Sequence, residues 1–597
     1  MKFRSDISFL RALSVIAVLL YHFKFSLFKG GFIGVDIFFV ISGYLMSKIV
    51  LDGFSSDKFN LIEFYSKRVV RIFPALLVMI TFFAVAIFLL IPTLFASYLR
   101  SYFPSTLFFS NIYYYLHSGY FDGSSQFNFL LHTWSLSVEW QFYMVYPLIL
   151  LIFRRMYLTN KRFFLAAFIM LLSISFISMI IHSLIDQSYS FYIFYTRAWE
   201  MMFGGLAFLF EDKVKSLSKF KKNIAVLISI LTICILITSI NAHKIPWPSL
   251  LTVVPVIATT LIILFKSDLN FFNYKAVNFI GNISYSLYLW HWPFYVLSIF
   301  FNMNLRLRHR IIFILLSIIF AILSYYFVEK RNYKKKTLYV LATSFILFII
   351  SYSFSQPDYN DTKTAEKQYN LKGEYFRYDQ EIKDYNFKKL SPGKRYILLL
   401  GDSHAGMFYQ TISEIAKEEN YDLIQITADG TYPMINANTP FQGPKEYFNY
   451  FYKEYFPKIK NKIELVIINS HYNTYNKNQL ERNINFTENY FSKFNTKTLY
   501  LGLTPEFPIE YPTYIYIKDK YNILPELDQK FKEIYKSTNF YIKKKLGSKY
   551  LDFSEYPVKK QSKEGVPYVY DFHHLTHFGT EEYKFLIKEK IVEIISN

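Results

Sequence analysis

The sequence predicts two parts of different fold class: a polytopic α-helical membrane part, followed by an α/β part with a parallel sheet. Long apolar runs recur between residues 7 and 355, and each is close to the ~20 residues that a helix needs to cross a bilayer. From about residue 356 the chain mixes polar and apolar side chains, and short strand patterns alternate with helical ones. A chain of 597 residues is also too long for a single core.

Eleven apolar runs have the length of a membrane span. We expect these spans near residues 7–23, 32–51, 74–97, 135–153, 164–184, 193–210, 223–240, 249–265, 280–300, 310–328 and 337–355. The aromatic-rich region 98–134 becomes too polar for a simple span, which favours a partly embedded outer loop or half helix. The first run contains an arginine and lacks a small-residue cleavage site, so we expect an uncleaved span rather than a signal peptide.

Basic side chains in the loops predict the orientation of the spans. With the amino terminus in the cytoplasm, roughly three times as many Lys and Arg lie in cytoplasmic loops as in outer loops. The cytoplasmic set comprises Lys67, Arg68, Arg71, Arg154, Arg155, Lys161, Arg162 and the segments 213–222 and 330–336. Eleven crossings then place everything after about Gln356 outside the cytoplasm. The expected parts are a ten-span domain (1–335), an eleventh span (336–356), an extracytoplasmic linker (357–394) and the α/β domain (395–597).

Composition excludes several classes of protein. The net charge of +21 comes largely from loops between apolar runs and no nucleic-acid recognition motif accompanies it, so we expect no nucleic-acid partner. The single cysteine, Cys234, lies in an apolar run, which excludes disulfides and a thiolate metal site. No metal-binding cluster or nucleotide-binding loop is evident in the sequence, so we expect no metal.

The first span carries two ionisable side chains inside an apolar run. Arg11 and His22 are eleven residues apart, so a helix brings them to nearly the same face, roughly 16 Å apart along its axis. Such groups are costly in lipid unless they face a bundle interior, which makes them candidates for function. The unperturbed pKa of a histidine side chain lies near neutrality, so His22 can take up or pass on a proton, and Arg11 offers donors to a phosphate or an oxyanion. The alternative is a structural ion pair with Asp36 or Glu139.

Seven blocks of the first part resemble, in order, those of the membrane-bound acyltransferase family 3. They are RSDISFLRALSVIAVLLYHF, GGFIGVDIFFVISGYL, FYSKRVVRIFPAL, LLHTWSLSVEWQFYMVYP, YTRAWEMMFGG, GNISYSLYLWHWP and the segment from Tyr325 to Glu329. The resemblance implies that an acyl group, usually acetyl from cytoplasmic acetyl-CoA, is transferred to a hydroxyl of a surface or exported glycan. It also implies that Arg11 and His22 form the essential Arg-x10-His motif of the family. One departure is Lys330 after Glu329, where the family often has Pro.

Other polar residues of the first part are weaker candidates. Arg68 and Arg71 lie at a cytoplasmic mouth, where they either hold the phosphates of CoA or only anchor the loop. The remaining intramembrane candidates are Asp36, His132, Trp134, Glu139, Arg197, Glu200 and His291. Arg197 and Glu200 are three residues apart, which favours a structural pair on one helix face. His132, Trp134 and Glu139 straddle a membrane edge where substrate could enter, and His291 lies between two tryptophans that also suit an interfacial anchor.

The second part opens on a strand, a tight turn and an amphipathic helix, within RYILLLGDSHAGMFYQTISEIAKE. Ser403 lies at the turn, where its hydroxyl is exposed and its amide begins a helix, and both features suit acyl transfer. The runs DLIQITA, IELVIINS and KTLYLGLTP indicate further buried strands of a parallel sheet with crossover helices. Asp571 and His574 lie three residues apart in a loop before the final helix.

GDSH near the start and Asp-x-x-His near the end resemble the SGNH hydrolase family over residues 395–597. This resemblance implies a three-layer α/β fold, with Ser403 as nucleophile, His574 as its base and Asp571 as the group that orients the imidazole. Gly430 matches the position of a second oxyanion donor, and the third donor is either Asn469 or Asn473. Four neighbours have lesser expected roles, His573 and His577 as competitors for the base and Asp402 and His404 as residues that shape the turn.

Together the two parts imply an O-acyltransferase, most simply an O-acetyltransferase, in a bacterial inner membrane. Acetyl-CoA is the only cofactor implied, and the expected partners are the lipid bilayer and a surface or lipid-linked glycan. Lipopolysaccharide O-antigen, capsule, secreted polysaccharide and peptidoglycan all remain open as acceptors. Two alternatives also remain open: the α/β domain is an esterase that removes acyl groups, or the bundle is a glycan or lipid transporter. The internal repeats typical of transporters are not evident in the sequence.

Overall fold

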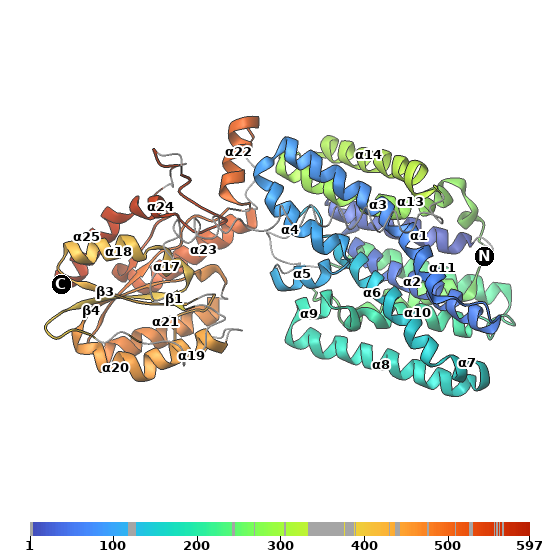
Figure 1. Ribbon diagram of the computed structural model, residues 1–597, viewed down its shortest axis with the longest axis horizontal. Coiled ribbons are helices and arrows are strands. Elements are labelled where there is room, and N and C mark those ends of the chain that lie inside the picture. The colour runs from blue at the N-terminus through green and yellow to red at the C-terminus, as the bar shows by residue number, and fades with distance from the viewer. Residues whose placement is uncertain are drawn as a thin grey trace. The chain divides into compact units, whose positions relative to one another are not determined.

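The computed structural model forms two compact units, Met1–Gln356 and Pro357–Asn597 (Figure 1). The structure describes residues 4–117, 127–241, 245–267, 269–303, 306–331, 375–376, 387, 390–428, 430–435, 442–474, 477–507, 509–523, 529–554, 556, 559, 561–563 and 566–596. The predicted eleventh span, 336–356, and most of the predicted linker, 357–394, lie outside these residues.

Ten helices of the first unit overlap the first ten predicted spans. They are α1 (Ser5–His22), α2 (Gly34–Ser55), α3 (Leu61–Leu90), α6 (Thr133–Ile152), α8 (Lys161–Ile185), α10 (Phe194–Phe210), α11 (Lys219–Ser239), α12 (Val253–Phe265), α13 (Lys275–Phe300) and α14 (Leu307–Ser324). Among the described residues, seven helices are long and apolar enough to cross a membrane, namely α1, α2, α3, α6, α8, α11 and α14. The other three, α10, α12 and α13, are helices in the structure but do not meet this criterion of length and apolar composition. The prediction of spans is therefore confirmed in part.

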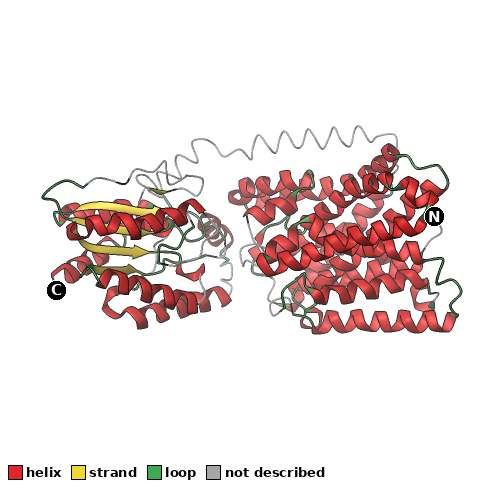
Figure 2. Cartoon of the chain, turned by 90° about the horizontal axis from the view of Figure 1, so that it is seen from below, coloured by secondary structure: helices red, strands yellow, loops and turns green. Residues whose placement is uncertain are grey.

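The region between α3 and α6 contains two short helices, α4 (Phe95–Thr106) and α5 (Ser110–His117). This agrees with the expectation of short helical structure there instead of a simple span, although residues 118–126 lie outside the described part. The smaller helices α7 (Arg154–Thr159) and α9 (Gln187–Tyr192) flank α8. Figure 2 shows that the first unit is built of helices and that the strands belong to the second unit.

Glycines allow the central helices of the first unit to approach closely. A Cβ atom at Gly43 of α2 would overlap the carbonyl oxygen of Met201 in α10, and one at Gly204 of α10 would overlap that of Val40 in α2. Small residues at such crossings let helix backbones come together where a larger side chain would hold them apart. The α2–α10 contact places the polar side chains of the two helices against each other inside the bundle.

The second unit contains a sheet of six parallel strands in the order β1-β3-β2-β4-β5-β6. The strands are β1 (Tyr375–Phe376), β2 (Tyr396–Gly401), β3 (Asp422–Ala428), β4 (Ile463–Asn469), β5 (Lys497–Leu501) and β6 (Tyr550–Leu551). The four predicted strands, β2 to β5, are confirmed. The two edge strands were not predicted, because two residues are too few to show a strand pattern.

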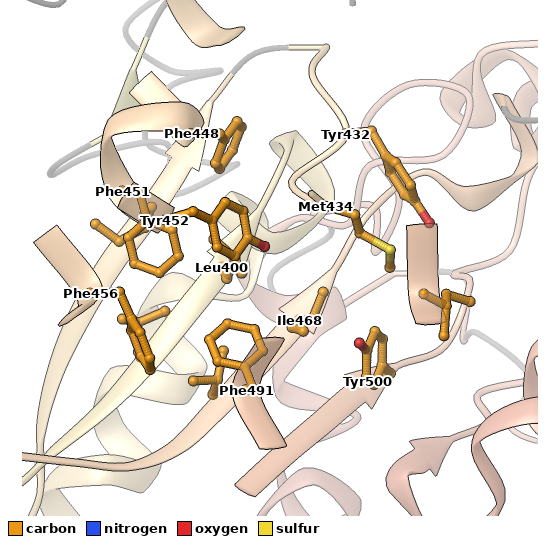
Figure 3. Close-up of a cluster of buried hydrophobic side chains, with 14 of the residues drawn as sticks. Leu400, Tyr432, Met434, Phe448, Phe451, Tyr452, Phe456, Ile468, Phe491 and Tyr500 are labelled. Atoms are coloured by element: carbon orange, nitrogen blue, oxygen red, sulfur yellow. The ribbon is translucent and has the colours of Figure 1, made fainter. Parts of the chain in front are cut away.

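Helices cover both faces of this sheet (Figure 1). They are α17 (Ser403–Met407), α18 (Tyr409–Glu418), α19 (Gln442–Tyr450), α20 (Phe456–Ile459), α21 (Lys477–Ser492), α22 (Tyr511–Tyr521), α23 (Gln529–Leu546), α24 (His577–Glu581) and α25 (Lys584–Ser596). Leu398 and Leu400 of β2 join one buried cluster, shown in Figure 3, while Ile397 and Leu399 join another. Because neighbouring residues of a strand face opposite sides, the two clusters are the cores on the two faces, and the fold has three layers.

Candidate active sites

The turn after β2 is held by an aspartate on the amino side of Ser403. Asp402 caps α17, since its Oδ1 accepts the amide N–H of His404 at 2.9 Å. Its Oδ2 accepts the Ser470 hydroxyl at 2.5 Å and the amide of His471 at 2.9 Å, which ties the end of β2 to the end of β4. A Cβ atom at Gly401 would overlap the carbonyl oxygen of Asn469, so this position requires glycine. The GDSH sequence therefore folds as a rigid strand-to-helix turn.

Three residues distant in sequence form a continuous chain of hydrogen bonds at this turn. Ser403 Oγ lies 2.8 Å from His574 Nε2, and His574 Nδ1 lies 2.8 Å from Asp571 Oδ2. Asp571 Oδ1 also accepts the amides of His573 and His574, at 2.9 and 2.8 Å. This arrangement can deprotonate a serine hydroxyl and stabilise the imidazolium that results.

The loop that carries Asp571 and His574 is fixed by backbone contacts from the segment after β5. The amide of Phe507 donates to the Phe572 carbonyl at 2.7 Å, and the amide of Tyr511 donates to the Asp571 carbonyl at 2.9 Å. Burial opposes ionisation of Asp571, but the imidazoles of His574 and His573 and the two amide donors outweigh it and lower the pKa of this carboxyl below its ordinary value. Asp571 is therefore a carboxylate wherever His574 works as a base.

The predicted oxyanion donors lie at the same edge of the sheet as Ser403. Gly430 follows β3 and has φ +48°, a backbone conformation that favours glycine. Asn469 ends β4, and its amide nitrogen lies 3.4 Å from the carbonyl oxygen of His404. The amide group of Asn473 instead donates to Glu506 Oε1 at 2.7 Å, which commits it to that carboxylate. This contact favours Asn469 over Asn473 as the third donor.

The two competing histidines do not contact the serine hydroxyl. His577 Nε2 lies 3.0 Å from the side-chain nitrogen of Gln410, and His573 Nδ1 lies 3.0 Å from His404 Nε2. The structure also adds a residue that the sequence analysis missed, Glu506, whose carboxylate pairs with His471 Nε2 at 2.8 Å. Glu506 follows β5 at the carboxyl edge of the sheet. Its position shortly after a predicted strand could have indicated that it lies near the site.

In the first unit, Arg11 and His22 both face α13. Arg11 Nε donates to Ser284 Oγ at 3.0 Å, and His22 Nδ1 lies 2.9 Å from His291 Nε2. Arg11 forms no salt bridge with a described acidic residue, so the alternative of an ion pair with Asp36 or Glu139 is wrong for these side chains.

The contacts of His291 set which nitrogen of each imidazole carries a proton. His291 Nδ1 lies 2.7 Å from the Tyr288 carbonyl oxygen, which can only accept, so Nδ1 carries the hydrogen. In the neutral ring Nε2 is then an acceptor, and His22 donates to it through Nδ1–H. His22 is left with Nε2 as the nitrogen that can take a proton. Trp290 and Trp292 beside it are 2% and 4% exposed, so the interfacial-anchor interpretation is wrong for these tryptophans.

Three of the four arginine candidates line one cavity of about 110 Å³. Arg11, Arg68, Arg71 and Glu139 line it, together with apolar residues of α2 and α13. Glu139 accepts hydrogen bonds from Ser42 and Tyr143 instead of pairing with an arginine. Arg68 Nε is buried and has no hydrogen-bond partner among the described residues. Three guanidinium groups with at most one carboxylate leave this cavity with an excess of positive charge.

A second, smaller cavity of about 30 Å³ is lined by five of the other candidates, but not by Glu200 or His291. Its polar lining consists of Tyr21, His22, Asp36, His132, Trp134, Arg197, Trp247, Tyr288 and Trp292. Val35 and Tyr288 line both cavities, so they form the partition between the arginine side and the histidine side. The sequence did not indicate Tyr288 or Trp247 as site residues, because a tyrosine or tryptophan in an apolar run is common.

Arg197 is the centre of a buried ionic group beside the second cavity. It contacts Glu200 and Asp36, each at 2.5 Å, and all three side chains are at most 1% exposed. The predicted pair of Arg197 and Glu200 is therefore present, and Asp36 joins it from α2. Asp36 thus has a structural partner of its own, and this group ties α2 to α10.

Comparison with known proteins agrees with this geometry. The family described as "Acyltransferase domain" matches residues 4–329, more than half of the 597 residues. The chain belongs to this acyltransferase family. A second family, described as an SGNH domain fused to acyltransferase-3 domains, matches residues 371–588 of the same acyltransferase chain.

Several bacterial proteins are similar in sequence to this acyltransferase. It is 33% identical to the peptidoglycan O-acetyltransferase OatA of Listeria monocytogenes, over 50% of each chain. It is 32% identical to the putative peptidoglycan O-acetyltransferase YrhL of Bacillus subtilis, over 54% of this chain and 53% of the relative. The chain thus spans about half the length of these two relatives. An uncharacterised protein of Haemophilus influenzae is 35% identical over 38% of this chain and 96% of its own.

Among solved structures, the periplasmic domain of a lipopolysaccharide acetyltransferase from Salmonella Paratyphi A aligns with 34% of this chain and 85% of its own. The sequence identity is 19% and the TM-score is 0.28.

Proposed function

We propose that this acyltransferase is an O-acetyltransferase that moves an acyl group from cytoplasmic acyl-CoA to hydroxyl groups of a cell-surface or exported glycan, such as peptidoglycan or lipopolysaccharide O-antigen. The observation that carries the proposal is the hydrogen-bonded chain of Ser403, His574 and Asp571 in a member of the acyltransferase family. Such a serine forms an ester with the acyl group and then yields it to a second hydroxyl. The glycan acceptor is supported by the similarity to a peptidoglycan O-acetyltransferase and a putative one.

The arginine-lined cavity fits the acyl donor. Arg68 and Arg71 would bind the phosphates of acyl-CoA, because guanidinium groups pair with phosphate oxygens through two parallel hydrogen bonds. Arg11, deeper along α1, would help to hold the acyl-CoA in the same cavity through its guanidinium donors. His22, which lines the second cavity, would accept through Nε2 the proton of a hydroxyl group on an acyl carrier, since Nδ1 is committed to His291. The carrier oxygen would bond to the acyl carbonyl carbon as the acyl–sulfur bond breaks, and His22 would then give its proton to the released CoA sulfur.

Ser403 would receive the acyl group in the second unit. Its Oγ attacks the carbonyl carbon of the acyl group on the carrier, while His574 Nε2 takes the hydroxyl proton. His574 then gives that proton to the carrier oxygen as the bond between this oxygen and the acyl group breaks. The amides of Ser403 and Gly430 and the side chain of Asn469 would stabilise the oxyanion. His574 then deprotonates a sugar hydroxyl, which attacks the acyl-enzyme and releases Ser403. Water in place of the sugar turns the same steps into ester hydrolysis.

We also propose that the amino terminus is cytoplasmic and that the unit from Pro357 lies outside. Residue numbers increase in the same direction along α1 and α13 at their contacts: Ser8 lies against Gly281, Arg11 against Ser284 and His22 against His291. The two helices are therefore parallel, as the first and ninth crossings of a chain must be. Membrane-impermeant labelling of a cysteine placed in α25, in a Cys234→Ser background, tests the outer location.

The test of function is the O-acyl content of surface glycan, measured by mass spectrometry in cells that express matched amounts of each variant. Wild type adds acyl groups, and we expect both His22→Ala and Ser403→Ala to abolish the addition. His577→Ala, outside the proposed machinery, serves as the control. If Ser403→Ala raises acylation while His22→Ala abolishes it, the second unit is an esterase that opposes the first. If neither variant changes the glycan, the acyltransferase proposal fails and the transporter alternative replaces it.

A further inference from the structure

Four imidazole rings gather beside the Ser403 hydroxyl, more than a serine-histidine-aspartate arrangement needs. His404 follows the nucleophile in α17, His471 follows β4, and His573 precedes His574 in the loop before α24. The His404 ring stacks on those of His471 and His573, with centroids 4.7 and 4.9 Å apart. The proposed reaction uses only His574, so the other rings need a separate explanation.

Two of these rings present ring nitrogens to each other as metal ligands do. His404 Nε2 and His573 Nδ1 are 3.0 Å apart, and one nitrogen each of His404, His573 and His574 lie within 4.8 Å of one another. A tetrahedral Zn²⁺ ion with Zn–N bonds of about 2.0–2.1 Å holds its ligand nitrogens roughly 3.4 Å apart. The three nitrogens, at most 4.8 Å apart, therefore lie close to the spacing that the ligands of such an ion require.

The carboxylate of Asp571 adds negative charge to this group of rings. Its Oδ2 lies 2.8 Å from His574 Nδ1, and its Oδ1 accepts the amide of His573 at 2.9 Å. A negative charge so close favours the binding of a cation.

We propose that His404, His573 and His574 form a site for a borderline-soft divalent cation of the Zn²⁺ class, and that occupancy of this site reversibly switches off Ser403. The inhibitory half of this inference rests on the proposed function of Ser403, whereas metal binding itself does not.

Inhibition follows from the contacts of His574. One of its nitrogens contacts Ser403 and the other contacts Asp571, so a metal can take His574 only by breaking one of these two hydrogen bonds. Loss of the first removes the general base from the nucleophile, and loss of the second removes the group that orients the ring. Either event stops deprotonation of the hydroxyl.

The surroundings of His404 indicate a regulatory ion, bound and released, instead of a permanent one. A metal on Nε2 forces the hydrogen of the neutral ring onto Nδ1, and that buried atom has no hydrogen-bond partner among the described residues. Ligand histidines of tight sites normally donate their second N–H to an acceptor, and loss of such a partner costs about 10–100-fold in affinity. We therefore expect an affinity about 10–100-fold weaker than that of a site in which this N–H has an acceptor.

A second group, Glu414, His577 and Glu581, also brings possible ligand atoms together, but it is a poorer site. The ammonium group of Lys584 lies 2.6 Å from Glu414 and 3.7 Å from Glu581, where it neutralises the carboxylates and repels a cation. His577 therefore provides a matched control for His573, because both are partly exposed histidines outside the serine-histidine-aspartate chain.

The experiment uses the purified full-length protein in detergent and two separate readouts. Zn²⁺ binding is measured by competition with a chromophoric indicator, and Ser403-dependent hydrolysis of p-nitrophenyl acetate is titrated with ZnCl₂, with MgCl₂ and with ZnCl₂ followed by a chelator. We expect Zn²⁺ but not Mg²⁺ to inhibit, and the chelator to restore activity. His573→Gln should weaken both binding and inhibition by at least about tenfold, and His577→Ala should change neither. Ser403→Ala should retain the binding.

Two results would overturn the inference. The site is absent if Zn²⁺ binds wild type and His573→Gln with equal affinity, and the switch is absent if Zn²⁺ binds without affecting hydrolysis. Should wild type show no hydrolysis that depends on Ser403, the proposed function of the second unit fails instead, and the binding measurements still decide the metal site. Thermal unfolding midpoints of the variants show whether a lost signal reflects a misfolded protein.

Discussion

Replacement of Asp571 by asparagine tests the role of the carboxylate with little change in shape. Asp571 Oδ1 accepts two backbone amides, so the Asn oxygen must stay on that side, since the NH₂ group would meet two donors there. The NH₂ group then faces His574 Nδ1, which has to become an acceptor, and the ring hydrogen moves to Nε2. His574 would donate to Ser403 Oγ and could no longer take its proton. This wrong tautomer costs about 10⁴-fold in serine hydrolases, or roughly 5 kcal/mol of transition-state stabilisation.

The assay is Ser403-dependent hydrolysis of an aryl acetate by the purified full-length protein, with the thermal unfolding midpoint recorded for each variant. Asp571→Asn should lose about 10⁴-fold in kcat/KM while the protein remains folded at the assay temperature, because both amide contacts are kept. Asp552→Asn makes the same chemical change at a carboxylate that contacts Ser554 and Lys543, and it should stay within about twofold. The reasoning is refuted if Asp571→Asn keeps more than a tenth of the wild-type rate, since the tautomer would then not matter.

Three further outcomes follow from the structure. Arg197→Met leaves Asp36 and Glu200 buried without a cation and should destabilise the membrane unit by about 3–5 kcal/mol. Arg154→Met breaks an exposed pair with Asp57 and should lower the free energy of unfolding by at most about 1 kcal/mol. Equal losses of stability for Arg197→Met and Arg154→Met, measured by unfolding in detergent, would contradict this expectation. His291→Phe removes the acceptor of His22 and should lower glycan acylation at least about tenfold at equal membrane levels, whereas exposed His117→Phe should leave it unchanged. The pKa of Asp571 is lower in the folded protein than in the unfolded chain, so its carboxylate stabilises the fold fully above the unfolded pKa of about 4, and this stabilisation is lost as pH falls further. Wild type should therefore lose more stability between pH 6 and 3 than Asp571→Asn. Parallel curves of unfolding free energy against pH for the two proteins would rule this out.

Much of the fold could be predicted because its signals are local. A long apolar run indicates a membrane helix, and a short run of branched apolar residues, such as those of β2 and β4, indicates a buried parallel strand. The edge strands β1 and β6 were missed, since two residues carry no periodicity. Helix α13 is less apolar than a typical membrane span. Its sequence contains many polar and aromatic residues, because it lines both cavities.

The candidate site divides in the same way. Ser403, Asp571 and His574 could be singled out because a strand-turn-helix and an Asp-x-x-His spacing are visible in the chain, and helical spacing placed Arg11 and His22 on one face. Their partners could not be predicted: Ser284 and His291 are more than 260 residues away in sequence from the side chains that they contact. The neighbours Glu506 and His471 meet only at the edge of the folded sheet.

By itself, the sequence determined the two-part architecture, the membrane and α/β character of the parts and the candidate residues for acyl transfer, since each depends on composition or on spacing within one helix or turn. Only the tertiary structure decided that Arg11 and His22 line separate cavities, that Asp36 belongs to Arg197 and not to Arg11, and that His574 and not His573 or His577 reaches Ser403. The physical reason is that hydrogen bonds and ion pairs act over about 3 Å, and which groups come that close depends on how helices and strands pack.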